Sequence, residues 1–193
     1  MKKIITVVTV LLIAWFVGSQ LISKARSVGV NQGYEPDQPI AYSHKIHAGD
    51  NQISCLYCHV GADKGRHAGI PSANICMNCH VKIKTDSPEI KKIKTALEQN
   101  KPIEWVKVHR LPDFAYFNHS QHVTSGVNCQ ECHGEVQTMT RLRQEKPLTM
   151  GWCIDCHRAK GIVSPQGHPD IKNKNPQEFM KAIGGVDCAK CHY

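Results

Sequence analysis

Aromatic residues are scarce in this chain, at 6% of its 193 residues, and no segment alternates apolar and polar residues as a half-buried strand does. Only one stretch, near the N-terminus, is apolar enough to cross a membrane, which excludes a polytopic transporter. The 14 glycines follow no three-residue period, which excludes collagen. A core built only from the side chains beyond the apolar stretch would therefore be thin.

Cysteine is present in unusual number, since ten cysteines fall into five Cys-x-x-Cys-His motifs with none left over. This is the attachment pattern of c-type haem. Two thiols on one helical turn reach the two vinyl groups of a porphyrin, and the adjoining histidine binds the iron. The predicted thioether residues are Cys55, Cys58, Cys76, Cys79, Cys129, Cys132, Cys153, Cys156, Cys188 and Cys191. The predicted proximal ligands are His59, His80, His133, His157 and His192.

Zinc binding and disulfide formation are two other uses of paired cysteines. The 17 residues between Cys58 and Cys76 fit a zinc ribbon, and pairs could also close disulfides. Neither use needs a histidine directly after every second cysteine. Five covalent haems also account for the thin core, because the macrocycles would be the buried apolar mass.

The apolar stretch covers residues 4–22, which is close to the length of a membrane-spanning helix. A cleaved signal peptide is the alternative, because small residues at Gly18 and Ser19 could mark a cleavage site. The length favours a retained anchor. Basic residues on the two sides nearly balance, so orientation follows from chemistry. Bacteria attach haem covalently outside the cytoplasmic membrane, which predicts a single-pass membrane protein with its haem domain on the periplasmic side.

The sequence divides into three parts. Residues 1–26 are the predicted transmembrane anchor, and residues 27–41, which hold Gly and Pro and few apolar side chains, are the predicted linker. Residues 42–193 are the predicted pentahaem domain, whose fold class is mostly loop with short α-helices packed around haems. Two longer helices are expected in it, one from Pro88 to the exit at Asn100 with Ser87 as its cap, and one over residues 175–184.

An internal repeat lies within the haem domain. Tyr42-x-His44-x-x-His47 stands 11 residues before Cys55, counted from its first histidine, and Phe117-x-His119-x-x-His122 stands 10 residues before Cys129. Each copy carries a second haem motif, 21 or 24 positions after its first. The domain is therefore predicted to be two dihaem units followed by a single haem at Cys188.

Seven further histidines could supply the sixth ligand of each iron. His44 and His119 are expected to bind the haem of the motif that follows each of them. His47 and His122, three residues later on the same helical face, can reach a neighbouring haem. The fifth distal ligand is predicted to be His109 or Met150, and a thioether would raise the potential of that haem. His67 and His168 are more typical of surface loops.

The sequence resembles the membrane-anchored pentahaem cytochrome c subunit of bacterial alternative complex III. The resemblance rests on the anchor, the five motifs, the paired histidines and three segments. These segments are Val108-His109-Arg-Leu-Pro-Asp113, Tyr116-Phe117-Asn118-His119 and Met150-Gly-Trp152-Cys153-Ile-Asp-Cys156-His157-Arg158. The resemblance implies that this chain belongs to a quinol-oxidising complex. Its partners there would be an iron–sulfur subunit, integral membrane subunits and a monohaem cytochrome c. The motifs alone are shared by class III multihaem cytochromes.

The predicted function is electron relay through five haems to a periplasmic acceptor or oxidase, without catalysis by this chain. A stand-alone membrane quinol dehydrogenase is the alternative from the enzyme class. A reductase of small oxyanions needs an open iron position, and the spare histidines outnumber the irons. The formal net charge is +8, but no basic stripe interleaved with aromatics is present, so no nucleic-acid partner is expected.

Overall fold

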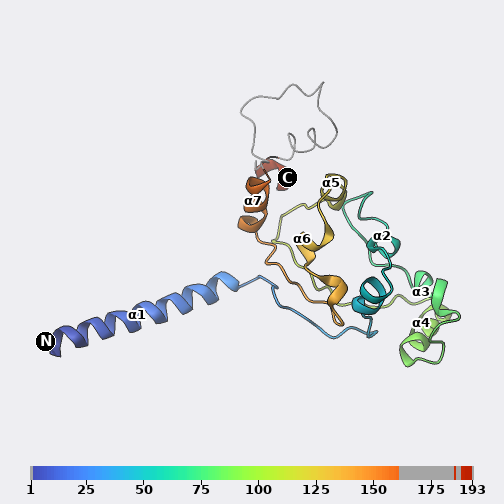
Figure 1. The fold of residues 1–193 in the computed structure, drawn as a ribbon, viewed down its shortest axis with the longest axis horizontal. Coiled ribbons are helices and arrows are strands. Elements are labelled where there is room, and N and C mark those ends of the chain that lie inside the picture. Colours follow the sequence, from blue (N-terminus) through green and yellow to red (C-terminus); the bar gives the residue numbers. More distant parts are fainter. Residues whose placement is uncertain (1, 161–184, 186–187, 193) are drawn as a thin grey trace, which may run out of the picture.

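The computed structural model describes residues 2–160, 185 and 188–192, and in this part of the chain it has short helices joined by loops and no strand. This confirms the predicted fold class. The elements in chain order are α1 (Lys2–Ser27), η1 (Lys45–Asp50), α2 (Cys55–Cys58), α3 (Ala73–His80), α4 (Pro88–Glu98), α5 (His119–Thr124), α6 (Cys129–His133), η2 (Val136–Thr138), α7 (Met150–Ala159) and α9 (Cys188–Cys191) (Figure 1).

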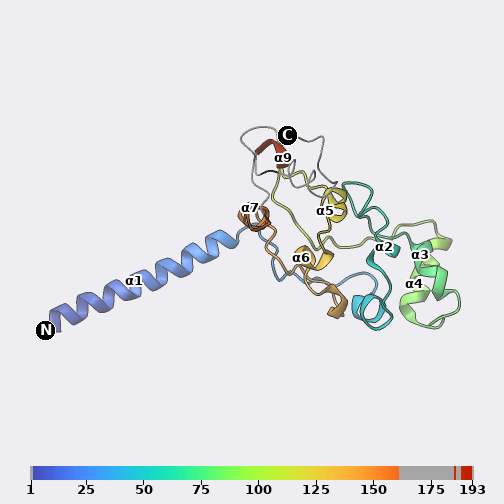
Figure 2. The same cartoon turned by 45° about the horizontal axis from the view of Figure 1, so that its top comes forward.

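Helix α1 extends away from the remaining elements in both views (Figures 1 and 2). Within it, 24 residues, Lys2–Ala25, are long and apolar enough to cross a membrane, and none of the most apolar window is buried by the protein. Large apolar side chains such as Trp15 and Leu11 are exposed on its surface. An apolar helix without a protein partner is the form expected of a single-pass membrane anchor.

Helix α4 carries much of the side-chain core. Ile90 and Ile93 lie on one face of it and pack with Ile40 from the segment before η1. Partly buried residues surround them: Ala73, Cys76, Met77, Leu97, Ile103 and Trp105. Pro88 occupies the first turn, and Asn100 leaves the helix with φ 51°, so the predicted boundaries are confirmed. Ser87 stands at the N-cap but makes no side-chain capping bond.

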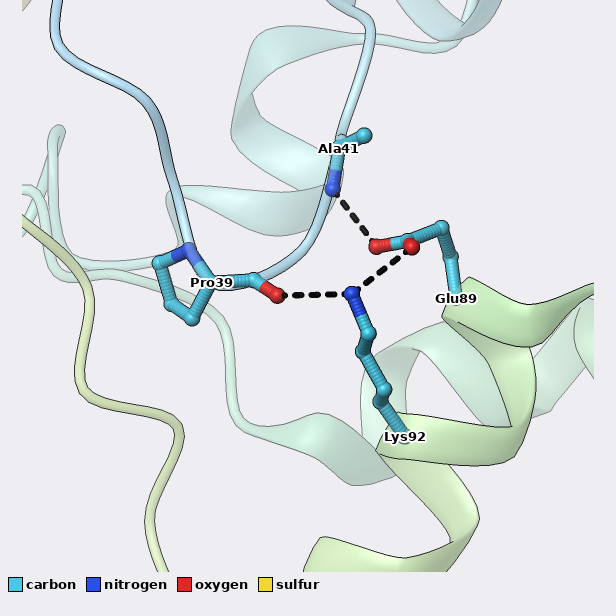
Figure 3. A network of polar contacts seen from close by, with 4 residues as sticks. All are labelled: Pro39, Ala41, Glu89 and Lys92. Carbon is cyan, nitrogen blue, oxygen red and sulfur yellow. Dashed lines mark hydrogen bonds and ion pairs between the residues drawn. The ribbon is translucent and has the colours of Figure 1, made fainter.

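A polar network ties the start of α4 to the chain ahead of the haem domain (Figure 3). Glu89 accepts a hydrogen bond of 2.8 Å from the Ala41 amide and pairs with the Lys92 ammonium at 2.8 Å. Lys92 also donates to the Pro39 carbonyl at 3.3 Å. The end of the predicted linker is therefore fixed against α4.

The middle of the predicted linker packs against a distant loop. The Gly33 amide donates to the Gln144 carbonyl at 2.7 Å, and the Gln144 amide donates back to the Tyr34 carbonyl at 3.0 Å. Arg141 forms ion pairs with Glu35 and Asp37. Paired backbone groups and charges therefore hold this part of the predicted linker against the loop that contains Arg141 and Gln144. The helix expected over residues 175–184 lies outside the described residues.

Candidate haem attachment sites

All five cysteine pairs lie on short helices. We number the motifs in chain order: motif 1 is residues 55–59, motif 2 is 76–80, motif 3 is 129–133, motif 4 is 153–157 and motif 5 is 188–192. Their cysteines fall on α2, α3, α6, α7 and α9. None of these ten cysteines, all among the described residues, forms a disulfide. One helical turn brings the two sulfurs of a motif to the same side, as attachment to one porphyrin edge requires.

Four of the five motif histidines, the predicted proximal ligands, are held in the same way. Their Nδ1 atoms lie within hydrogen-bond distance of backbone carbonyls: 2.7 Å for His59 to Gly69, 2.9 Å for His80 to Ile83, 3.0 Å for His157 to Gly185 and 2.8 Å for His192 to Phe114. A carbonyl can only accept, so each Nδ1 carries the proton. Each Nε2 therefore keeps a free lone pair, which is the tautomer that an iron needs.

His133, the histidine of motif 3, has a different partner. Its Nδ1 lies 3.1 Å from Nε2 of His109, and the two rings meet edge to face with centroids 4.4 Å apart. Burial, followed by the charge of His109, lowers the pKa of His133 to about 3. A neutral imidazole is the form that binds a metal.

Three of the predicted distal ligands face motif histidines, and the distance between ring centroids is nearly the same in all three pairs. Ring centroids are 6.0 Å apart for His47 and His80, 6.3 Å for His119 and His133, and 6.1 Å for His122 and His157. A metal bound by two opposite imidazoles, with metal–nitrogen bonds of about 2 Å, puts the ring centroids about 6 Å apart. The spacing of these pairs thus fits bis-histidine haem iron.

His44 lies near His59, the proximal histidine of the motif that follows it. Burial, and then the neighbouring His59, lower the pKa of His44 to about 4. The Nδ1 atom of His44 is buried and has no hydrogen-bond partner among the described residues. A buried neutral imidazole beside His59 suits a distal ligand of the motif 1 haem.

The two repeats share their side-chain geometry. Tyr42 meets His44 at 87° and lies nearly parallel to His47, with centroids 4.9 and 4.4 Å apart. Phe117 meets His119 at 87° and tilts over His122, with centroids 4.8 and 4.4 Å apart. The aromatic ring of each repeat therefore fixes the orientation of both histidines.

The second histidine of each repeat is fixed in a further way. Nδ1 of His47 lies 2.8 Å from the Ser43 carbonyl, and Nδ1 of His122 lies 2.9 Å from the Asn118 carbonyl, each four residues back. Nδ1 of His119 lies 2.8 Å from the Arg66 carbonyl. These bonds leave Nε2 of the three histidines for a metal.

The motifs do not follow one another in space as they do in sequence. Burial, and then the nearby Cys76 thiol, raise the pKa of Cys58, and this interaction connects motif 1 with motif 2. Burial and then Cys55 raise the pKa of Cys129, which joins motifs 1 and 3.

Thiols of the later motifs also interact with one another. Burial and then Cys156 raise the pKa of Cys132 to about 11, and burial and then Cys191 raise that of Cys153. Electrostatic interactions between thiols therefore link the motifs in the order 2, 1, 3, 4, 5. The helices α3, α2, α6 and α7 follow one another in this order across Figures 1 and 2, and α9, labelled in Figure 2, lies next to α7.

The remaining candidate ligands are more dispersed. Met150 is the first residue of α7 and is 60% exposed. His67 is exposed on the loop before α3. His109 is the residue that contacts His133, and His168 lies outside the described residues. Sequence reasoning did not find the contact between His109 and His133, because their separation in the chain gives no signal of it.

Two comparisons with known proteins show what this chain is similar to. A family model described as "Cytochrome c3" matches residues 121–193. The chain is also 32% identical over 100 residues to the menaquinone reductase multihaem cytochrome c subunit of Nitratidesulfovibrio vulgaris, strain Hildenborough. That alignment covers 51% of this chain and 47% of the relative, so the chain matches about half the length of this curated protein. Residues 121–193 are therefore similar to a cytochrome c3 domain, and half of the chain is similar to a multihaem cytochrome c subunit.

Proposed function

We propose that this chain is an electron-transfer subunit that relays electrons through five covalent haems within a quinol-oxidising membrane complex. The observation that carries the proposal is the set of facing imidazoles, with centroids 6.0 to 6.3 Å apart, at three of the motifs. Bound haem supplies reversible one-electron chemistry. Two protein ligands on each iron leave no position open for substrate, as suits a carrier and not a catalyst.

The residues of the chain hold and orient each haem in this proposal. The ten motif cysteines form the thioethers, and the five motif histidines supply the proximal ligands. His44, His47, His119 and His122 supply four distal ligands. Hydrogen bonds from Nδ1 to carbonyls hold most of these rings in place before a metal binds, which limits reorganisation when the charge on the iron changes.

The position of the anchor supports an end-to-end relay. Residues 28–30, directly after α1, line one hollow together with residues 147–149, directly before α7. Motif 4 therefore lies beside the end of the anchor, whereas α3 and motif 2 lie at the side of the domain farthest from α1 (Figure 1). We propose that motifs 4 and 5 face the membrane subunits and that motif 2 lies at the far end on the periplasmic side.

We propose Met150 as the fifth distal ligand, for the haem of motif 5. Met150 lies one helical turn before Cys153 on α7. The pKa of Cys153 is raised by burial and then by the Cys191 thiol of motif 5. His109, the other candidate from the sequence, directs its Nε2 toward His133 instead.

The proposed complex is one of the alternative complex III type. The relative from Nitratidesulfovibrio vulgaris is a subunit of a menaquinone reductase by its name, which supports a membrane complex with quinone chemistry. The partners proposed for this chain are an iron–sulfur subunit, integral membrane subunits and a monohaem cytochrome c. Quinol oxidation would take place in those membrane subunits.

Isolation of the native protein in mild detergent tests the proposal. We expect this chain to stain for haem after denaturing electrophoresis and to co-purify with an iron–sulfur subunit and polytopic subunits, identified by mass. A colourless chain, or a red chain that purifies alone from gently solubilised membranes, would contradict the proposed role.

A stand-alone quinol dehydrogenase is the second candidate. The hollow at the end of the anchor, lined also by Arg110, Pro112 and Asp113, is the feature that favours it, because a quinol head could lie there beside motif 4. The described residues include one helix that could span the membrane and enclose such a ligand, and quinol sites need several converging walls. Saturable, inhibitor-sensitive haem reduction by menaquinol in the purified single chain would favour this candidate.

A further inference from the structure

We propose that His109 is a positioning residue for the motif 3 haem, which accepts the hydrogen bond from Nδ1 of the proximal ligand His133 and thereby lowers the reduction potential of that haem. The inference rests on the proposed function, because it concerns the haem that motif 3 would hold. It adds a residue whose role is to tune an iron that it does not touch.

The hydrogen-bond partner of His133 is a side chain, whereas the partners of the other motif histidines are backbone carbonyls. Nε2 of His109 lies 3.1 Å from Nδ1 of His133, and the rings meet at 76° with centroids 4.4 Å apart. His59, His80, His157 and His192 each direct Nδ1 to a carbonyl oxygen. Motif 3 is therefore the motif in which a substitution can remove the acceptor.

The same geometry separates this role from that of a ligand. An iron between two imidazoles needs ring centroids about 6 Å apart, and 4.4 Å leaves no room for it. His119 lies 6.3 Å from His133 with the two rings only 13° from parallel, so the ligand partner of His133 is already present. His109 approaches His133 from its Nδ1 edge, away from the atom that would bind iron.

The segment that carries His109 is held in place on both sides. Val108, before it, is 5% exposed. The amide of Arg110, after it, donates to Oε1 of Gln144 at 2.8 Å, and Nε2 of Gln144 donates to the Lys146 carbonyl at 3.0 Å. Gln144 is fully buried. A buried side chain that orders the backbone beside His109 gives the imidazole a fixed direction.

The effect on potential follows from the electronics of the proximal ligand. A hydrogen bond from Nδ1 to an acceptor increases the basicity of the ligating nitrogen, and a more basic ligand stabilises ferric over ferrous iron. Loss of the acceptor should therefore raise the potential of one haem. Since His109 does not bind the iron, its loss should leave the spin state unchanged.

The test compares His109→Ala and His109→Gln with the unaltered chain, each in the purified membrane complex. Absorbance-monitored redox titration reports the potentials, and electron paramagnetic resonance reports the spin states. We expect one potential to shift upward in H109A, with all haems low-spin, and a smaller shift in H109Q, whose amide oxygen can accept the bond. Lys107→Ala, two residues away on the exposed surface, is the matched control and should shift nothing.

Three results would overturn the inference. A high-spin haem that binds carbon monoxide in H109A would make His109 a ligand. Equal shifts in H109A and H109Q would remove the hydrogen bond as the cause, and unchanged potentials in H109A would remove the role altogether. A chain without covalent haem would instead refute the proposed function, so the two failures are distinguishable.

Discussion

His47 and His80 face each other with ring centroids 6.0 Å apart, although they belong to the upstream element of one motif and to the proximal position of the next. His122 and His157 repeat this relationship at 6.1 Å in the second half of the domain. In both halves, the second histidine of the repeat faces the histidine of the second motif downstream. In the proposed relay, each repeat would therefore supply distal ligands to two neighbouring haems.

We expect His47→Ala to leave all haems attached, because thioether formation needs only the cysteines, and to open the iron of motif 2. One haem should become high-spin and bind carbon monoxide. His122→Ala should do the same at motif 4. Absorption spectra of the reduced protein under carbon monoxide check this result.

The matched control for these variants is His67→Ala, which removes an exposed histidine that faces no motif histidine in the described rings. It should leave the spectrum unchanged. Fully low-spin spectra in both H47A and H122A would remove these histidines from the set of distal ligands.

Intact mass measures the number of haems. We expect the purified chain to exceed the mass of its polypeptide by five haems, because each of five motifs keeps both cysteines and the histidine. Cys188→Ser with Cys191→Ser should lower the mass increment by one haem and leave the other four. A wild-type chain that carries four haems would show that one motif is not used.

Much of this arrangement could be predicted from the sequence, because haem attachment depends on local spacing. The helix that begins at Pro88 and ends at Asn100 was also predictable from its cap and apolar stripe. The pairing of His119 with His133 follows from short separation in the chain.

The structure of the first repeat shows where local reasoning stops. Counted from its first histidine, that repeat has one residue more before its motif than the second repeat has. The extra residue is taken up in η1, a π-helix in which the Asn51 amide donates to the Ile46 carbonyl, five residues back. A single π turn inserts one residue without displacing His44 or His47 from their motifs.

Other features could not be predicted, since they depend on contacts between distant segments. The bond between His109 and His133 and the paired backbone of Tyr34 and Gln144 have no signature in either segment alone. The spatial order of the motifs is likewise a property of how the loops cross. The composition of the proline-containing segment before η1 likewise does not reveal its ion pairs with Arg141.

The network of Figure 3 predicts a pH dependence at the start of the haem domain. Hydrogen bonds from Lys92 and the Ala41 amide lower the pKa of Glu89. A carboxyl whose folded pKa is depressed stabilises the fold at neutral pH, and this contribution is lost as the pH falls through the folded pKa. Protection of the Ala41 amide in hydrogen exchange, corrected for intrinsic rates, should decrease over that range.

The matched variants for this network are Glu89→Ala and Glu98→Ala, both on α4. Only E89A should lower protection of the Ala41 amide at neutral pH, since Glu98 is exposed near the end of the helix. Equal protection in E89A and the unaltered chain would show that the bond adds nothing to local stability.

Helix α1 should keep the protein in membranes. None of the most apolar window of its 24-residue span is buried by the protein, so we expect the chain to resist extraction at alkaline pH and to require detergent. Its mature N-terminus should precede the apolar segment. A mature N-terminus near Gln20, with the protein soluble after cell breakage, would identify α1 as a cleaved signal sequence instead.

The fifth distal ligand gives the last prediction. A thioether from Met150 should produce a near-infrared sulfur-to-iron band in the oxidised protein and make the haem of motif 5 the one of highest potential, because a thioether stabilises ferrous iron relative to imidazole. Met150→His should abolish the band, lower that potential and keep all haems low-spin, whereas Met150→Ala should open one iron to carbon monoxide. Met77→Ala, on α3, should leave the band intact. If the wild-type protein lacks the band and M150A stays low-spin, the ligand must be a histidine, and His67 and His168 become the variants to compare.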